Sequence, residues 1–249
     1  MLIEINGHQL NVEDEGERQR PAVVLLHHGL GSAAAWRKQV PALVGAGFRA
    51  IAYDRWGYGK SQGRAGIDMP AFTQDLADLE RLLDVLELDK VGLVAHSDGG
   101  TIALYFAAAH PERVRCLVTV AAHVYIEARM ETALLEVSHN FEQDKRIREG
   151  LRHVHGEKFE QTFHNWFDGW RVCECGGWDM RPQIASIACP ALVVQGAEDE
   201  HATPQHAIDT AAVVPAAELW LVEGARHMLP QENAEQFNER LLSFLHMHM

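Results

Sequence analysis

The 249-residue sequence has little basic charge, few cysteines and no long hydrophobic run. It carries 22 lysines and arginines against 35 aspartates and glutamates, which gives a formal net charge of −13. Nucleic acids and anionic membrane surfaces bind basic patches, so this balance argues against both as partners. The longest apolar runs, such as Ala22–Leu26 and Val91–Ala95, are far too short to span a bilayer.

Cysteine usage and the N-terminus point to an intracellular protein. The N-terminal residues become acidic almost at once and lack the basic-then-apolar layout of a signal peptide. Cys173 and Cys175 are separated by one residue, which is not the spacing of a zinc knuckle, and the sequence has no second pair, so we expect no metal site. Cys116 and Cys189 stand alone. We therefore expect reduced thiols and a cytoplasmic location.

The two glycine-rich stretches do not match nucleotide-binding motifs. His28–Ser32 lacks both the G-x-G-x-x-G pattern and a Walker lysine, and Asp54–Ser61 fits neither template. The sequence therefore implies no cofactor. We interpret Asp54–Ser61 as a tight structural turn under the site.

Short apolar runs alternate with longer amphipathic segments along most of the chain. An opening antiparallel hairpin is expected around Asn6-Gly7. Its strands would be residues 2–5 and 9–14, with further strands at 22–27, 48–53, 90–96, 114–121, 191–195 and 218–222, and helices at 33–44, 70–86, 99–109, 204–214 and 230–245. This rhythm predicts an α/β fold with a doubly wound, mostly parallel sheet.

The alternation of strands and helices stops between His123 and Ile187, where the sequence is rich in aromatic residues and has a helical pattern throughout. We expect a helical cap of residues 123–187, inserted into a core domain made of residues 1–122 and 188–249. Ligands of open parallel sheets bind beyond the carboxyl ends of the strands. The loops that should carry the site therefore follow His27, Tyr53, His96, Gln195 and Val222.

The run Ala95-His96-Ser97-Asp98-Gly99 is close to the G-x-S-x-G nucleophile elbow. The elbow is a sharp strand-to-helix turn, and bulk two residues before or after the serine would collide with neighbouring elements. Alanine replaces the usual glycine at position 95 but is small enough. The alternative is that Ser97 simply caps the following helix.

A serine hydroxyl needs a base to take its proton, and the base needs an orienting acid. In the elbow architecture the order along the chain is serine, acid, histidine. Asp199 follows strand 191–195 and is the favoured acid, and His227 follows strand 218–222 and is the favoured base. The alternative for His227 is an ordinary surface-loop histidine.

Rival residues lie near both positions. Glu198 and Glu200 flank Asp199, and we interpret them as solvated loop acids. Asp54 is a weaker substitute for the acid. His201 is the main rival for the base, but it lies next to the proposed acid, where reaching both Asp199 and Ser97 is difficult.

The developing oxyanion needs hydrogen-bond donors that are fixed before the reaction. The expected donors are the backbone N–H groups of Leu30, in the loop after strand 22–27, and of Asp98.

Taken together, the chain resembles the α/β-hydrolase superfamily over essentially its whole length. The resemblance rests on His28-Gly29, the Asp54–Ser61 loop, the Ser97 elbow, Asp199 and His227, in that order. It implies the α/β-hydrolase fold, with a mostly parallel eight-stranded sheet flanked by helices and a helical cap. The form Ser97-Asp98-Gly99-Gly100 is similar to a branch of small esterases, some of which act on amino-acid esters. Trp56 stands where that superfamily frequently has arginine.

The resemblance implies a serine hydrolase, favouring a carboxylesterase that cleaves small to medium esters through an acyl-enzyme on Ser97. Carbon–carbon bond hydrolysis of ring-fission products and a non-catalytic, ligand-binding role are the alternatives. The partner would be a small-molecule ester, and monomer and homodimer both stay open. His28, Trp166 and Trp170 are candidate substrate-binding residues, although the tryptophans could instead pack the cap onto the sheet. The Asp98 carboxylate could select cationic substrates or only complement the helix dipole.

Overall fold

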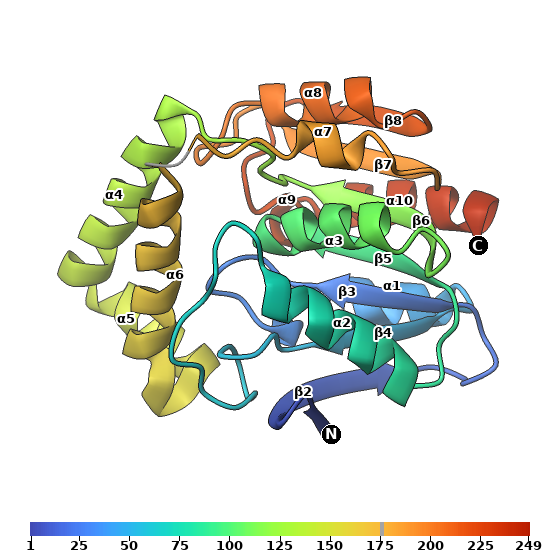
Figure 1. The fold of residues 1–249 in the computed structure, drawn as a ribbon, viewed down its shortest axis with the longest axis horizontal. Coiled ribbons are helices and arrows are strands. Elements are labelled where there is room, and N and C mark those ends of the chain that lie inside the picture. The colour runs from blue at the N-terminus through green and yellow to red at the C-terminus, as the bar shows by residue number, and fades with distance from the viewer. Residues whose placement is uncertain (175–176) are drawn as a thin grey trace.

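The computed structural model describes residues 1–174 and 177–249, so Cys175 of the Cys173/Cys175 pair lies outside the described residues. Its eight-stranded sheet has the order β1-β2-β4-β3-β5-β6-β7-β8 (Figure 1). The strands are β1 (Leu2–Ile5), β2 (His8–Glu15), β3 (Ala22–Leu26), β4 (Arg49–Tyr53), β5 (Val91–His96), β6 (Val114–Val120), β7 (Ala191–Gly196) and β8 (Ala217–Val222). β2 pairs antiparallel with β1 and β4, and all other neighbours pair parallel. This is the mostly parallel sheet that the sequence predicts.

Helices cover both faces of the sheet. In Figure 1, α2 (Thr73–Val85) and α3 (Asp98–Ala109) lie in front, and α1 (Gln39–Gly45) and α10 (Ala234–His248) lie behind. The remaining elements are the 3₁₀ helices η1 (Ala33–Trp36) and η2 (Gly156–Lys158) and the helices α4 (Ala128–Gln143), α5 (Lys145–His155), α6 (Phe159–Glu174), α7 (Arg181–Ile184), α8 (Gln205–Val213) and α9 (Leu229–Glu232). None of the described helices has the length and apolar content needed to cross a membrane.

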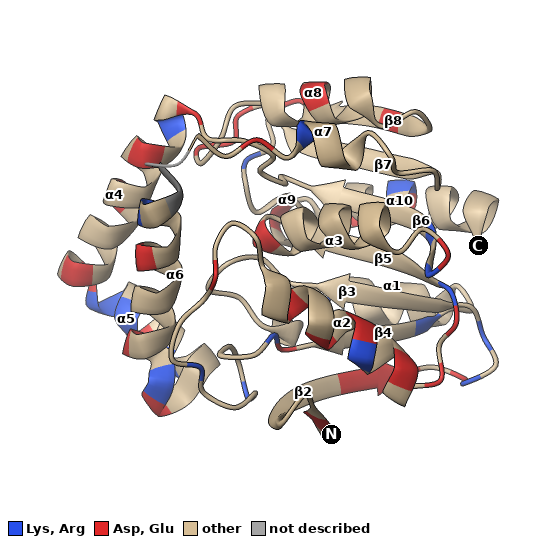
Figure 2. Ribbon diagram, viewed as in Figure 1, with Lys and Arg blue, Asp and Glu red and all other residues tan. Residues whose placement is uncertain are grey.

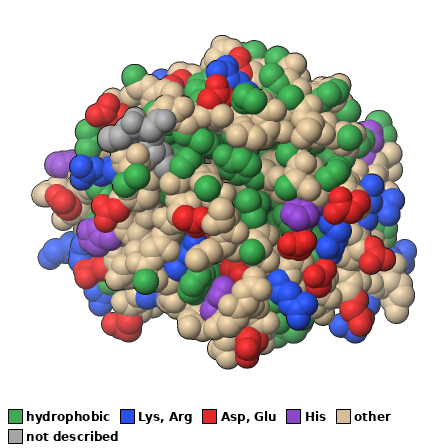
Figure 3. All heavy atoms as spheres, in the orientation of Figure 1, with side chains coloured by type: hydrophobic (Ala, Val, Ile, Leu, Met, Phe, Trp, Pro, Cys, Tyr) green, Lys and Arg blue, Asp and Glu red, His purple; other side chains and the backbone are tan. Residues whose placement is uncertain are grey.

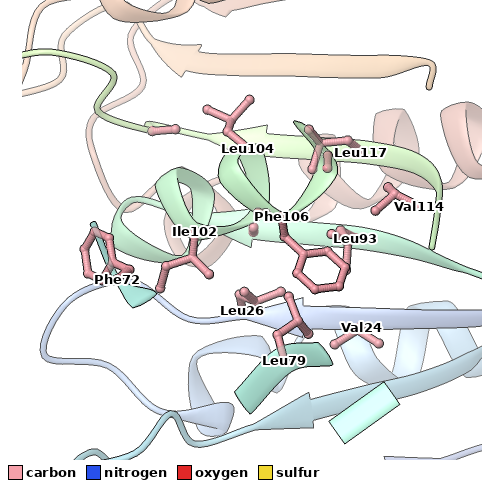
Figure 4. Close-up of a cluster of buried hydrophobic side chains, with 14 of the residues drawn as sticks. Val24, Leu26, Phe72, Leu79, Leu93, Ile102, Leu104, Phe106, Val114 and Leu117 are labelled. Atoms are coloured by element: carbon pink, nitrogen blue, oxygen red, sulfur yellow. The ribbon is translucent and has the colours of Figure 1, made fainter. Parts of the chain in front are cut away.

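The central strand β3 is apolar at every position because both of its faces are buried. In β3, Val24 and Leu26 join the core cluster under α2 and α3, whereas Val23 and Leu25 join the cluster under α1 and α10. Figure 4 shows Val24 and Leu26 beside Leu79 of α2 and Phe106 of α3. Burying one large apolar side chain stabilises the fold by about 1.5–3 kcal/mol. The helices on both faces therefore hold the strands that carry the site in place.

Two predicted helices are each divided in the structure, so those predictions are wrong in detail. The segment 33–44 forms η1 and then α1. Pro41 has no N–H with which to bond the carbonyl four residues earlier, so a continuous helix cannot pass through it, and it stands instead in the first turn of α1. The closing segment 230–245 forms α9 and α10, which are separated at Asn233, a residue with non-helical backbone angles (φ −108°, ψ 38°).

The helices α4, α5 and α6, together with η2, form a layer at one end of the sheet, at the left of Figure 1. We call them the α4–α6 segment. The segment has a small aromatic core of its own, in which Phe141 and Phe163 stack with ring centroids 3.7 Å apart. Its two ends meet at a bridge between Tyr125 and Asp179, which returns the chain to the sheet close to where it left.

Charged side chains of both signs lie on helices, loops and outer strands such as β2, while β3 and β5 at the centre carry none (Figure 2). On the face drawn in Figure 3, charged side chains gather toward the rim and hydrophobic ones nearer the centre.

Candidate functional site

A cavity of about 240 Å³ lies where the carboxyl ends of the strands meet the α4–α6 segment. Its polar lining comes mainly from loops that follow strands: His28, Ser97, Asp98, His123, His201 and His227. Its apolar lining includes Ile126, Met130, Leu134 and Val137, and Trp166 and Trp170 of α6 complete the wall. Residues from distant parts of the sequence therefore converge on one pocket, at the sheet edge that open α/β folds use for ligands.

Ser97 lies between β5 and α3 in a strained backbone conformation, with φ 54° and ψ −120°. A left-handed φ is unfavourable for a residue with a side chain and marks a position held by its surroundings. The turn is tight because α3 approaches closely: a Cβ on Gly99 would come within 2.5 Å of the Leu26 carbonyl oxygen. The Ser97 side chain makes no capping hydrogen bond to α3, so the helix-cap alternative does not describe it.

Asp199 and His227 form a hydrogen-bonded pair beside the cavity. His227 Nδ1 lies 2.8 Å from Asp199 Oδ2. That oxygen also accepts from Gln195 Nε2, and Asp199 Oδ1 accepts from the backbone amides of His201 and Ala202. Burial raises the pKa of Asp199, but these donors all favour its ionised form. A carboxylate that accepts from Nδ1 fixes the hydrogen there and leaves Nε2 as the basic nitrogen.

Burial holds the pKa of His227 well below its ordinary value, and the imidazoles of His201 and His28 add to this effect. The His201 ring lies 4.5 Å from the His227 ring, centroid to centroid. The imidazole is therefore neutral at neutral pH, as a proton acceptor must be. Ser97 and His227 line the same cavity, but no hydrogen bond joins their side chains among the described residues.

The rival residues occupy other positions. Glu198 is exposed, whereas Glu200 accepts a hydrogen bond from the His227 backbone amide at 3.1 Å and pairs with Arg226, so Glu200 is not a freely solvated acid. Asp54 is buried, and both of its carboxylate oxygens accept backbone amides, those of Ala33 and Lys60, as expected of a turn-forming residue. His201 lines the cavity, but its imidazole contacts the His227 ring, and only its backbone amide bonds to Asp199.

The loop after β3 presents Leu30 to the cavity in a left-handed conformation, with φ 58°. Within the described part of the chain, the N–H groups of Leu30 and Asp98 donate to no other protein atom. Asp98 is the first residue of α3, where helix N–H groups are free and carry partial positive charge. The two amides are therefore available to an anionic oxygen in the pocket.

The Asp98 side chain is 2 % exposed and lies at the end of a series of buried ion pairs. Its Oδ1 accepts from Trp170 Nε1 at 3.2 Å, and its Oδ2 lies 3.6 Å from an Arg55 nitrogen. Arg55 also pairs with Asp75, which pairs with Arg64. Burial raises the pKa of Asp98, and Arg55 opposes this rise. Oδ2 is buried and makes no hydrogen bond to the described residues.

Of the three predicted substrate-binding residues, His28, Trp166 and Trp170 all line the cavity. The sequence reasoning missed His123, which is 8 % exposed, lines the cavity and has no partner for either ring nitrogen in the described structure. The sequence did contain a signal for His123, because this residue lies in a loop that follows a predicted strand, as do the other residues of the site. Trp56 does not line the cavity, since its indole stacks on His8 with ring centroids 4.0 Å apart.

Residues 21–152, more than half of the chain, match the family model of the alpha/beta hydrolase fold. The chain therefore belongs to this family. The predicted α/β-hydrolase fold, with its mostly parallel eight-stranded sheet, is confirmed.

Several named relatives of this chain are hydrolases. The chain is 31% identical to "Serine hydrolase BPHL" of Homo sapiens over 98% of this chain and 85% of the relative. It is 25% identical to a 2-hydroxy-6-oxo-6-phenylhexa-2,4-dienoate hydrolase of Burkholderia cepacia, over 97% of this chain and 92% of the other. Among solved structures, the enol-lactonase from Burkholderia xenovorans LB400 shares the fold with a TM-score of 0.79 at 24% identity, covering 98% of this chain and 99% of the other.

Proposed function

We propose that this protein is a serine carboxylesterase, with Ser97 as nucleophile, His227 as base and Asp199 as orienting acid. The observation that carries the proposal is the Asp199–His227 pair at 2.8 Å on a cavity that also contains the strained Ser97. The 31% sequence identity to a named serine hydrolase, in an alignment that covers 98% of this chain, supports the proposal.

In the acylation step, Ser97 Oγ attacks the ester carbonyl carbon while His227 Nε2 takes the hydroxyl proton. The carbonyl oxygen becomes an oxyanion and accepts hydrogen bonds from the N–H groups of Leu30 and Asp98. The ester C–O bond then breaks, His227 Nε2 gives its proton to the leaving alkoxide, and the acyl group stays on Ser97. Asp199 holds the His227 ring and stabilises its charged form throughout.

Deacylation repeats these steps with water as the nucleophile. His227 Nε2 takes a proton from water as its oxygen attacks the acyl carbon. The second tetrahedral intermediate collapses, the proton returns to Ser97 Oγ, and the carboxylic acid leaves. The Ser97 proton thus leaves on the alcohol and a proton from water replaces it, so water is the only co-reactant and the enzyme is regenerated.

We assign residues 123–187 to a cap that covers the site. The apolar side of α4, through Met130, Leu134 and Val137, and the indoles of Trp166 and Trp170 would then contact the substrate. A cavity of about 240 Å³ lies below the usual range of small-molecule pockets, about 300–1,000 Å³, which favours small esters.

Asp98 gives this esterase a candidate preference for esters that carry an ammonium group. Asp98 lines the cavity, where low polarity strengthens a charged hydrogen bond. Arg55, 3.6 Å away, already compensates part of the charge, so the preference would be a matter of degree.

The test is a fluorophosphonate probe together with a substrate panel. Wild type should be labelled at Ser97 and should hydrolyse short p-nitrophenyl esters, while Ser97→Ala should do neither. A wild type that is not labelled would exclude the esterase and favour the non-catalytic, ligand-binding alternative.

Carbon–carbon bond hydrolysis is the second candidate, because a relative named for that type of substrate is 25% identical across nearly the whole chain. The panel therefore includes a vinylogous 1,5-diketone. Higher kcat/KM on the diketone than on every ester would assign the protein to that reaction, with the same three residues.

A further inference from the structure

Three imidazole rings hold the loop that carries the Leu30 amide, and one of them comes from the cap. The backbone oxygens of His28, Gly29 and Leu30 follow one another in this loop. The first lies 2.7 Å from His27 Nδ1, the second 2.6 Å from His28 Nδ1, and the third 3.0 Å from His155 Nε2. His155 is the last residue of α5, 125 residues away from Leu30 in the chain.

The protonation of His155 follows from its two partners. Its Nδ1 lies 2.9 Å from the backbone nitrogen of Gly59, which can only donate, and its Nε2 faces the Leu30 oxygen, which can only accept. The ring must therefore be neutral, with its hydrogen on Nε2. Burial lowers the pKa of His155 to about 4, so this form persists at neutral pH.

The two peptide groups that flank Leu30 are thus both held through their oxygens. His28 holds the Gly29 oxygen, whose peptide group includes the Leu30 N–H, and His155 holds the Leu30 oxygen. Fixing both planes fixes the direction of the Leu30 N–H at a left-handed backbone position that would otherwise relax. Oxyanion donors are effective because their direction is set before charge develops.

We infer that His155 is a positioning residue of the oxyanion hole, through which the cap holds the Leu30 amide on the reacting oxygen. The inference rests on the proposed esterase function. It means that the core alone has an incompletely fixed oxyanion hole, and that docking of the cap completes it.

Other cap residues bond to the core without touching the oxyanion loop, which supplies a matched control. Thr162 Oγ1 donates to the Gly57 oxygen at 2.9 Å, and Asn165 Nδ2 donates to the Arg64 oxygen at 2.8 Å. Thr162 is 3 % exposed and does not line the cavity, so Thr162→Val removes a buried cap–core hydrogen bond at a distance from the reaction.

Two substitutions separate the two hydrogen bonds of His155. In His155→Asn, the side-chain oxygen can occupy the place of Nδ1 and accept from Gly59, but nothing reaches Leu30. In His155→Gln, the amide nitrogen can occupy the place of Nε2 and donate to Leu30, while the bond to Gly59 is lost. Each variant loses one buried hydrogen bond, so a purely structural role would affect both alike.

The experiment measures kcat and KM on a short p-nitrophenyl ester, the rate of fluorophosphonate labelling and the melting temperature. We expect His155→Asn to lower kcat and the labelling rate at least tenfold, with KM within about twofold, while His155→Gln and Thr162→Val stay within about threefold of wild type. Removal of a whole oxyanion donor costs about 10²–10³ in kcat, so loosening one costs less.

Two results would overturn the inference while leaving the esterase intact: wild-type kcat in His155→Asn, or equal losses in the Asn and Gln variants. A wild type that is labelled but hydrolyses no ester would refute the proposed function alone, and the labelling rates of the variants would still decide the role of His155. A wild type inert in both assays would overturn both proposals.

Discussion

Acidification should destabilise this fold steeply, because six buried histidines are neutral in the native state. They are His27, His96, His123, His155, His206 and His227, and burial lowers the pKa of each. In the unfolded chain a histidine has a pKa of about 6.5. At a pH between the native and the unfolded pKa, the unfolded state binds more protons than the native state. The free energy of unfolding therefore rises with pH in this range and falls as the solution is acidified.

The size of the effect follows from the same linkage. A histidine that stays neutral in the fold loses about 1.4 kcal/mol of stability between pH 7.5 and pH 5.5, which is about 8 kcal/mol for six. Burial raises the pKa of Asp78, Asp98 and Asp199, and carboxyls that take up protons in the fold work in the opposite sense. We therefore expect a net loss of about 4 kcal/mol or more, a large part of the about 5–15 kcal/mol that holds a typical protein folded.

The measurement is urea unfolding at pH 7.5, 6.5 and 5.5 and constant ionic strength. With an m value of about 3 kcal/mol/M, the midpoint should fall by more than about 1 M over this range. His123→Leu removes one buried imidazole without breaking a described hydrogen bond and should flatten the dependence by about 1.4 kcal/mol. His153→Gln alters an exposed histidine and is the control. A midpoint that is flat or rises toward pH 5.5 would refute the neutral, buried state of these rings.

Four further predictions concern the site. Ser97→Ala should lower kcat on the order of 10⁶-fold in ester hydrolysis, and near-normal turnover would remove Ser97 from the mechanism. Asp199→Asn should cost on the order of 10⁴-fold in kcat, since an amide favours the wrong tautomer of its partner; a loss below tenfold would contradict its orienting role. Gly99→Ala, whose Cβ would lie 2.5 Å from a backbone oxygen, should lower the melting temperature and activity, whereas Gly45→Ala, with no atom within 4 Å, should do neither; equal melting curves would contradict the tight turn. Asp98→Asn should lower the ratio of kcat/KM for amino-acid esters to that for neutral esters about tenfold, and an unchanged ratio would end the selector hypothesis.

The fold and the main candidate residues were predictable because their signals are local. Ser97 lies between a short apolar strand and a small-residue helix start, and Asp199 and His227 each follow a recognisable strand. The chain order of these three residues adds information that no single motif contains. The same reasoning could have found His123, which follows the strand that ends at Val120.

Other features depend on contacts that sequence patterns do not encode. The partners of His155 are 96 and 125 residues away, and nothing at residues 144–155 distinguishes it from its exposed neighbour His153. The Asp98 network likewise depends on where Arg55 and Trp170 meet in space. The division of the helix predicted at 33–44 could have been predicted from Pro41.

Several side chains of the α4–α6 segment bond to the main chain of the core. His155, Lys158, Thr162 and Asn165 each bond to backbone atoms of the core, at Gly59, Leu30, Gly57 and Arg64. Side chains in the underlying loops can therefore change during evolution without removing these bonds, provided that the path of the backbone is kept. Such an attachment would let related cores exchange caps, and with them substrate preferences, while the reacting groups stay where they are.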